Sequence, residues 1–276
     1  MPTARSEIAG AALGSKIYVV GGFVAGGVTG ALEEYDPASD SWRMRSPLPL
    51  PLHHPAMTAL GNKLYVAGGF DSAGAPLARA WVYDPATDRW SSLPPMPTAR
   101  GALALGSAGG GIFAIGGIAQ GDLRANEVYD PVANAWRTRA PMPTARDHLA
   151  LAEVAGKLFV FGGRLGSFDV NLRQVEEYDP ATNSWRTLAA MPTARSGIAA
   201  SAVAGKVYVS GGEEGRGTFK ENEGYDTSAD TWGSYAPMPT PRHGHAAVAL
   251  DGKVYVIGGG PTPGGSESTL NEVFIP

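Results

Sequence analysis

The sequence contains no cysteine, which excludes disulfide bonds, thiol nucleophiles and cysteine-ligated zinc. Long apolar runs are also missing: the run at 158–161 is among the longest, whereas a membrane-spanning helix needs about 20 such residues. A large excess of either charge is also missing. The 22 basic and 26 acidic residues leave a net charge of −4 and no broad basic surface. We therefore expect no membrane partner and no nucleic-acid partner.

Glycine and proline, by contrast, are abundant, with 38 and 22 copies in 276 residues, which is typical of short strands joined by tight turns. Richness in alanine and glycine, with arginine far above lysine, is typical of a GC-rich bacterial gene. A glycine doublet recurs six times at intervals of 46 to 49 residues, each time after a short run of aliphatic and aromatic residues that predicts a strand. The doublets are Gly21-Gly22, Gly68-Gly69, Gly116-Gly117, Gly162-Gly163, Gly211-Gly212 and Gly258-Gly259.

Each repeat carries further markers after its doublet. In five repeats a tyrosine, followed by aspartate, precedes a tryptophan by seven residues, and an arginine, mostly within Met-Pro-Thr-Ala-Arg, comes ten residues after most tryptophans. These markers divide each repeat into four antiparallel strands: A is rich in alanine and glycine, B ends in the doublet, C contains the tyrosine and D the tryptophan. Small residues suit strands crowded around an axis, and large aromatic residues suit wider outer strands. The pattern predicts an all-β, six-bladed β-propeller of four-stranded antiparallel blades.

The doublet, the Tyr-Asp pair, the spaced tryptophan and the Met-Pro-x-x-Arg segment closely resemble the Kelch repeat over essentially the whole chain. The resemblance implies a single Kelch-type propeller domain over residues 1–276, a fold that hosts protein-binding adaptors, sugar-processing enzymes and oxidases. We expect the repeated arginines to make structural contacts between blades, by bridging a carboxylate or stacking on a ring. We place the blades at approximately 5–51, 52–99, 100–145, 146–194, 195–241 and 242–276.

The last repeat ends at Pro276 before any D strand, while residues 1–5 match the segment that follows a D strand elsewhere. We therefore expect a three-stranded sixth blade with an open edge. An upstream segment of the natural chain is expected to close it, and an open edge could also pair with another molecule.

One mouth of the central channel is the predicted binding site. Nearly all length variation among the repeats falls between strands B and C, whose loops share one end with the starts of strand A, and all five histidines lie near those starts. In Kelch adaptors of ubiquitin ligases, which the chain resembles, residues just after the arginine and just after the doublet contact the bound peptide. The candidate ligand-binding residues are Ser6, Glu7, Phe23, His53, His54, Phe70, Asp147, His148, Arg164, Ser196, Glu213, His243 and His245.

We expect a binding module that receives a peptide, a protein or a glycan at this mouth. The arginine cluster with which such adaptors hold acidic peptides is missing, so a reader of acidic peptides is not expected. An enzyme resembling the bacterial Kelch-type sialic acid mutarotases is an alternative; His148 with Asp147 or Glu213 would supply its acid–base pair, and Arg164 would hold a carboxylate. No catalytic residue is assigned on this basis. A natural or designed scaffold without an evolved ligand is a third interpretation.

We expect no cofactor, because no helix follows the glycine doublets and they are therefore not phosphate loops. The main prediction also includes no metal. Histidines occur on the second, fourth and sixth blades only, however, and their imidazoles could converge on an ion with Asp147 or Glu7 as a further ligand. The metal-ligand candidates are His54, His148 and His243, with His53 and His245 as the neighbouring options.

Overall fold

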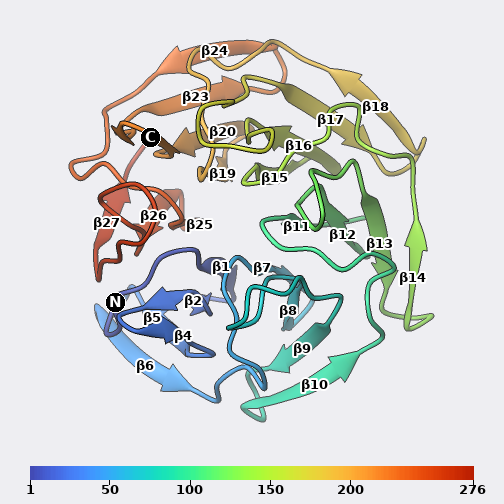
Figure 1. Ribbon diagram of the computed structural model, residues 1–276, viewed down its shortest axis with the longest axis vertical. Coiled ribbons are helices and arrows are strands. Elements are labelled where there is room, and N and C mark those ends of the chain that lie inside the picture. The colour runs from blue at the N-terminus through green and yellow to red at the C-terminus, as the bar shows by residue number, and fades with distance from the viewer.

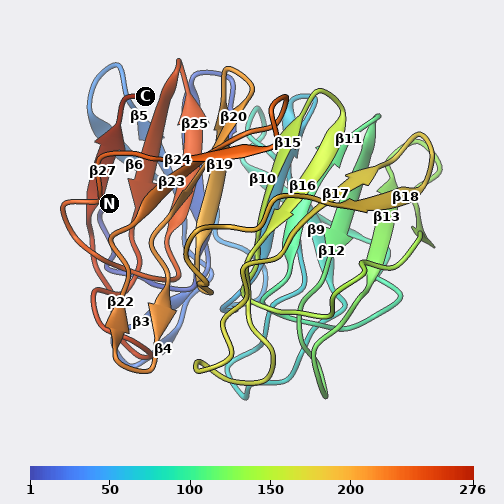
Figure 2. The same ribbon diagram turned by 90° about the horizontal axis from the view of Figure 1, so that it is seen from above.

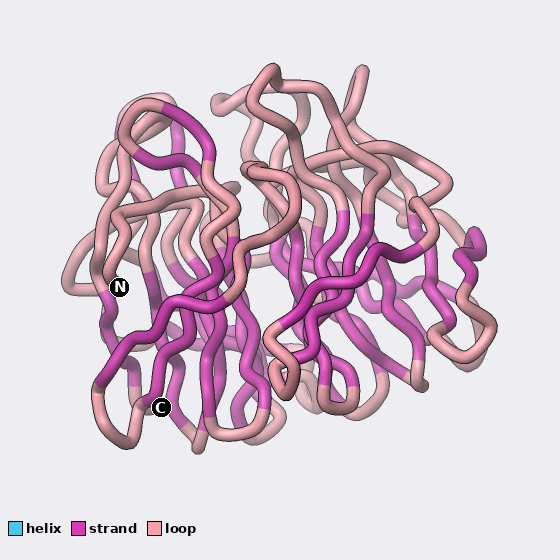
Figure 3. Tube along the Cα trace, turned by 90° about the horizontal axis from the view of Figure 1, so that it is seen from below, coloured by secondary structure: helices cyan, strands magenta, loops and turns pink.

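The computed structural model describes residues 1–276 as six antiparallel sheets arranged around a central channel (Figure 1). This arrangement confirms the predicted all-β, six-bladed propeller. Strands, loops and turns make up the whole chain (Figure 3), and no helix is long and apolar enough to cross a membrane.

Within each blade the strands follow one another outward from the channel in the order A, B, C and D. Blades 1 to 3 comprise β1 (Ala9–Leu13), β2 (Lys16–Val20), β5 (Leu32–Asp36) and β6 (Ser41–Arg45); β7 (Ala56–Leu60), β8 (Lys63–Ala67), β9 (Ala80–Asp84) and β10 (Arg89–Leu93); and β11 (Ala104–Ala108), β12 (Gly111–Ile115), β13 (Asn126–Asp130) and β14 (Ala135–Thr138). Blades 4 to 6 comprise β15 (Ala150–Val154), β16 (Lys157–Phe161), β17 (Val175–Asp179) and β18 (Ser184–Thr187); β19 (Ala199–Val203), β20 (Lys206–Ser210), β23 (Asn222–Asp226) and β24 (Thr231–Ser234); and β25 (Ala246–Leu250), β26 (Lys253–Ile257) and β27 (Asn271–Phe274). Two short hairpins, β3 (Phe23–Val24) with β4 (Gly27–Val28) and β21 (Glu213–Glu214) with β22 (Gly217–Thr218), lie in the B–C loops of blades 1 and 5.

The hydrophobic core consists of apolar layers between neighbouring blades. Between blades 1 and 2, for example, Tyr18 and Leu32 belong to one buried cluster with Leu64 and Val66. The innermost strands are rich in alanine, glycine and other small residues, which leave a cavity of about 290 Å³ along the channel. The expectation of small residues at the axis is therefore confirmed.

The tyrosine–tryptophan motif joins each of blades 2 to 5 to the blade before it. In blade 4 the Tyr178 ring lies 5.0 Å from the Trp185 ring, and the Tyr178 hydroxyl donates to Asn183 Oδ1 at 2.7 Å. Trp185 Nε1 donates to the carbonyl of Ala140 in blade 3 at 2.8 Å. Tryptophans of blades 2, 3 and 5 donate to the preceding blade in the same way. The sequence motif is thus a clasp between blades, and it contributes to the fold rather than to a binding site.

Both glycines of every doublet adopt positive φ, which glycine does at the lowest cost. In blade 4 the φ angles are 51° at Gly162 and 99° at Gly163. A Cβ atom on Gly163 would lie 2.6 Å from the carbonyl oxygen of Asp147, which is the residue opposite the end of the doublet. Close backbone approach therefore excludes a side chain at this position.

The repeated arginines Arg5, Arg100, Arg146, Arg195 and Arg242 are fully buried, and each pairs with a glutamate on strand C. In blade 4, Arg146 Nη1 lies 2.5 Å from Glu176 Oε2. The expected carboxylate bridge is present, but it runs within one blade. Only the backbone of the arginine links two blades, since the Gly117 amide of blade 3 donates to the Arg146 carbonyl at 3.0 Å.

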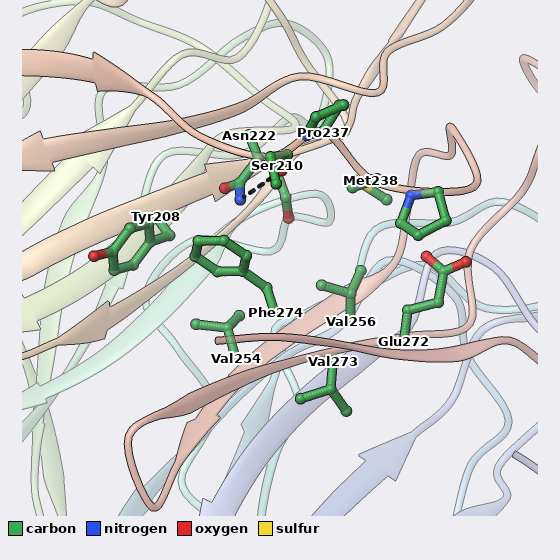
Figure 4. Close-up of a pocket in the computed structure, with 12 residues that line it drawn as sticks. Tyr208, Ser210, Asn222, Pro237, Met238, Val254, Val256, Glu272, Val273 and Phe274 are labelled. Atoms are coloured by element: carbon green, nitrogen blue, oxygen red, sulfur yellow. Dashed lines mark hydrogen bonds between the residues drawn. The ribbon is translucent and has the colours of Figure 1, made fainter. Parts of the chain in front are cut away.

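The sixth blade has three strands, as predicted, and β27 forms its outer edge. Phe274 pairs with Val254 in the register that the tyrosines of strand C use elsewhere. Beside this edge lies a mainly apolar cavity of about 190 Å³, whose lining includes Tyr208, Met238 and Phe274 (Figure 4). The predicted pairing of this edge with another molecule stays a prediction.

Candidate functional site

The two faces of the propeller differ, because one face carries the long B–C loops and the other carries short turns (Figures 2 and 3). On the loop face, the residue after each arginine position forms a β-bridge with the residue after the doublet of the same blade. The two positions that the sequence marked as candidate contacts are therefore adjacent in every blade. The bridged pairs are Ser6–Phe23, His53–Phe70, Gly101–Ile118, Asp147–Arg164, Ser196–Glu213 and His243–Gly260.

The second residue after the arginine position forms a ring around the channel. Its φ is positive in all six blades, and its amide donates to the equivalent carbonyl of the neighbouring blade; at the junction of blades 6 and 1 the donor is instead the amide of Ile8. Glycine adopts this backbone conformation at the lowest cost, and the ring uses it in blades 5 and 6. The ring residues are Glu7, His54, Ala102, His148, Gly197 and Gly244. The backbone thus needs no side chain here, yet blades 1, 2 and 4 carry ionisable ones.

Glu7 lies at the centre of a buried hydrogen-bonded group. Its Oε2 lies 3.1 Å from His54 Nε2, and its Oε1 lies 2.9 Å from His243 Nδ1. His243 Nε2 in turn lies 3.1 Å from the carbonyl of Thr262, so both nitrogens of His243 face acceptors and the ring is doubly protonated. Burial opposes this charge, but the hydrogen bond and charge of Glu7 raise the pKa of His243. Burial also opposes ionisation of Glu7, but the His54 and His243 rings hold its pKa well below the usual range.

Arg164 organises the opposite side of the mouth. Its Nε donates to Asp147 Oδ1 at 3.1 Å, its Nη1 to Glu213 Oε1 at 3.2 Å, and its Nη2 to His148 Nε2 at 3.0 Å. His148 Nδ1 contacts Asp147 Oδ1, so the proton of His148 lies on Nδ1 and its Nε2 accepts. Burial, with the nearby Arg164 charge, lowers the pKa of His148 to about 3. His148 is therefore neutral at pH 7.

Two further carboxylates adjoin this side of the mouth. Burial raises the pKa of Glu213, whose Oε2 accepts from the Gly264 amide at 3.1 Å. Asp122, which the sequence interpretation missed, has its pKa raised to about 6 by burial and by the Asp147 carboxylate. Only its place in a B–C loop could have indicated it, because acidic residues are common in loops and its distance from Asp147 appears only in the fold.

Aromatic rings form one wall of the mouth. The His53 ring is stacked between Phe23 and Phe70, with centroid distances of 4.1 and 5.3 Å. His53 Nδ1 lies 2.6 Å from His54 Nδ1, so the stack also orients the His54 ring. Phe168, another residue that sequence reasoning missed, covers the Arg164 guanidinium at 4.2 Å.

These side chains surround a cavity of about 640 Å³ at the channel mouth. Blades 1, 2, 4, 5 and 6 contribute to it, and blade 3 does not. Its acidic lining residues are Glu7, Glu213 and Glu267, and its only arginine or lysine is Arg164. The lining comprises Glu7, Phe23, Val24, Ala25, Gly26, Gly27, His54, His148, Arg164, Phe168, Glu213, His243, Gly264, Gly265 and Glu267.

Six of the sequence candidates do not line this cavity. His53, Phe70 and Asp147 pack against side chains that do, whereas Ser6, Ser196 and His245 lie apart from it. Ser6 and Ser196 are fully buried, and their hydroxyls have no hydrogen-bond partner. They contribute to the mouth through their backbone bridges to Phe23 and Glu213. His245 is buried in the place that Ile8, Leu103, Leu149 and Ile198 occupy in other blades. Its Nε2 lies 3.0 Å from Ser210 Oγ of blade 5. The structure therefore places His245 between blades, below the mouth.

The arrangement also bears on the acid–base pair considered for the enzyme alternative. His148 and Asp147 are in contact, but Arg164 Nη2 donates to His148 Nε2, the only nitrogen of that ring free to accept a proton. Arg164 itself is held by Asp147 and Glu213 and would have to release one of them to hold a substrate carboxylate. As arranged, His148 can accept a proton from a ligand only after Arg164 Nη2 leaves its Nε2.

Comparison with known families covers all six blades. A family model described as the KLHDC2/KLHL20/DRC7 Kelch-repeats domain matches residues 102–275, which is more than half of the chain. A Kelch motif model matches residues 4–49 and 51–97. No curated protein matches the sequence.

Proposed function

The chain belongs to the Kelch-repeat family, whose propellers are typically protein-interaction modules, and on that premise we propose that it binds a protein segment carrying a basic side chain. The segment would insert this side chain into the cavity at the channel mouth. The observation that carries the proposal is the charge of the cavity, where the three carboxylates of Glu7, Glu213 and Glu267 outnumber the two cations, Arg164 and the doubly protonated His243. A cationic side chain complements this excess of carboxylates.

The shape and the aromatic wall of the cavity support the same ligand class. A volume of about 640 Å³ accommodates one long side chain with part of its backbone. Phe23 lies in the lining, where its ring can pack on the aliphatic stem of lysine or arginine or face the cationic head. The variable B–C loops around the rim supply further contacts to the flanking residues of the segment.

Fluorescence anisotropy with short labelled peptides tests this proposal. Peptides with a central lysine or arginine are expected to bind at least tenfold more tightly than matched peptides with a central glutamine or glutamate, and to weaken as salt rises. Equal affinity for all four peptides, or tighter binding of the glutamate peptide, would refute the proposal. So would binding of neutral glycans with no peptide binding.

A pair of neighbouring variants locates the binding site. Glu213 is buried in the cavity, whereas Glu214 is exposed on the same short strand. Glu213→Gln removes one carboxylate charge without changing shape, and we expect a loss of about 1–2 kcal/mol, or five- to thirtyfold, in affinity for the lysine peptide. Glu214→Gln is expected to bind like the wild type. If the two variants weaken binding equally, the peptide binds elsewhere.

A further inference from the structure

We propose that the floor of the mouth is a binding site for one divalent transition-metal ion, held by Glu7, His54 and His148. These residues offer one carboxylate oxygen and two imidazole nitrogens from three different blades, and their ligand atoms all lie within 4.8 Å of one another. Two imidazoles and a carboxylate suit zinc and other divalent ions of the first transition row. This proposal does not depend on the peptide-binding function proposed above. Because the ion would cancel the carboxylate excess of the cavity, zinc and a basic peptide are expected to compete.

The ring of backbone hydrogen bonds fixes the positions of the three ligands. The His54 amide donates to the Glu7 carbonyl at 3.0 Å, and Ala102 connects His54 to His148 through bonds of 3.1 and 3.0 Å. All three ligand residues hold a left-handed φ between 49° and 53°, which is uncommon for residues with side chains. Glycine at the same ring position in two other blades shows that the fold does not require these side chains.

Each histidine has a partner on the nitrogen that faces away from the proposed ion. His148 Nδ1 contacts the Asp147 carboxylate, and His54 Nδ1 lies 2.6 Å from His53 Nδ1. Histidines that bind metal ions nearly always use the second nitrogen in this way, because the partner fixes the ring orientation and the tautomer. The Nε2 atoms of both histidines are thereby left for the ion.

The ion would replace two existing contacts. Without the ion, His54 Nε2 donates a hydrogen bond to Glu7 Oε2 at 3.1 Å. When the ion binds, the proton of His54 moves to its Nδ1 and the proton of His53 moves to its Nε2. Neither ring loses a proton, so none is released. Arg164 Nη2 would leave His148 Nε2 but keep its bonds to Asp147 and Glu213. Tetrahedral zinc separates its ligands by about 3.3 Å, so the ligand atoms would move together by at most about 1.5 Å.

A second group at the mouth, Glu7 with Glu213 and His243, has the same spacing but fits an ion less well. Both nitrogens of His243 already face acceptors, on Glu7 and Thr262. Because both groups share Glu7, we expect one ion per chain. The cavity above the floor leaves room for water or a ligand atom as the fourth donor.

Zinc titration of chelator-treated protein, followed by calorimetry and by metal analysis after gel filtration, tests the proposal. We expect one zinc per chain that survives gel filtration. The variants Glu7→Gly, His54→Gly and His148→Gly each remove one ligand, and glycine adopts the positive φ of these positions most readily. Each variant should weaken zinc binding at least a hundredfold. Ala102→Gly changes the same ring without removing a ligand and should bind zinc like the wild type.

A fifth variant separates metal ligation from a structural role. Arg164→Gln removes a positive charge and the donor that covers His148 Nε2, and should therefore tighten zinc binding. Failure of the wild type to retain zinc would overturn the proposal. Unchanged binding by the three glycine variants, a loss of binding in Ala102→Gly, or weaker binding in Arg164→Gln would each do the same.

Discussion

Replacing Arg146 with alanine is expected to lower the free energy of unfolding by about 3–5 kcal/mol, or the melting temperature by about 10 °C. Arg146 is fully buried and pairs with Glu176, whose side chain is itself nearly inaccessible. The substitution would leave the Glu176 carboxylate buried without its cation, and the carbonyls of Thr144 and Val160 would each lose a donor. Urea unfolding monitored by circular dichroism measures the effect.

Two comparisons make this prediction specific. Arg186 pairs with Glu177, the residue next to Glu176, but 61% of the Arg186 side chain is exposed, so Arg186→Ala should cost less than about 1 kcal/mol. Replacing both members of the buried pair, with Arg146→Met and Glu176→Leu, should be less harmful than Arg146→Ala alone, because no isolated charge remains. Similar losses for Arg146→Ala and Arg186→Ala would show that burial of the pair does not matter.

Replacing Gly163 with alanine is expected to cost about 3 kcal/mol or more. The φ of 99° is unfavourable for any residue with a Cβ atom, and that atom would lie 2.6 Å from the Asp147 carbonyl. Relief of this contact requires backbone movement where Asp147 and Arg164 are bridged, so the mouth should also be distorted. Gly156 is the matched control, since its φ of 80° is also positive but nothing lies within 4 Å of its Cβ position.

For Gly156→Ala, only the backbone term of about 1–2 kcal/mol remains. The difference between the two variants in urea unfolding isolates the cost of close approach inside the blade. If Gly163→Ala is no more destabilising than Gly156→Ala, glycine is needed in the doublet only for its positive φ, and the proposed steric role is incorrect.

Much of the fold could be predicted from the sequence because the same marker residues recur at nearly the same spacing in successive repeats. Spaced markers such as Tyr178, Asn183 and Trp185 define a hairpin and its contact with the preceding blade, and five copies remove ambiguity. The sequence could not show whether the arginine–carboxylate bridge joins two blades or lies within one. A buried arginine such as Arg146 needs a carboxylate, but only the fold shows that Glu176 of the same blade supplies it.

The candidate site was predictable in its location and less so in its contacts. Glu7, His54 and His148 occupy equivalent repeat positions, so the sequence places them on one ring. The same reasoning did not place His245 correctly. Its side chain faces a neighbouring blade, and a residue at that position is buried whatever its type. Asp122 was missed because its proximity to Asp147 depends on loop conformation, which the repeat does not encode.

The central claim is that the ionisable side chains of the mouth serve a ligand and are not needed for folding. The melting temperature of the metal-free triple variant Glu7→Gly, His54→Gly, His148→Gly tests it most directly. Relief of three left-handed conformations, at about 1–2 kcal/mol each, should offset the lost hydrogen bonds and the greater chain entropy of glycine. We therefore predict a value within about 4 °C of the wild type. A fall as large as that expected for Arg146→Ala would show instead that these side chains hold the propeller together.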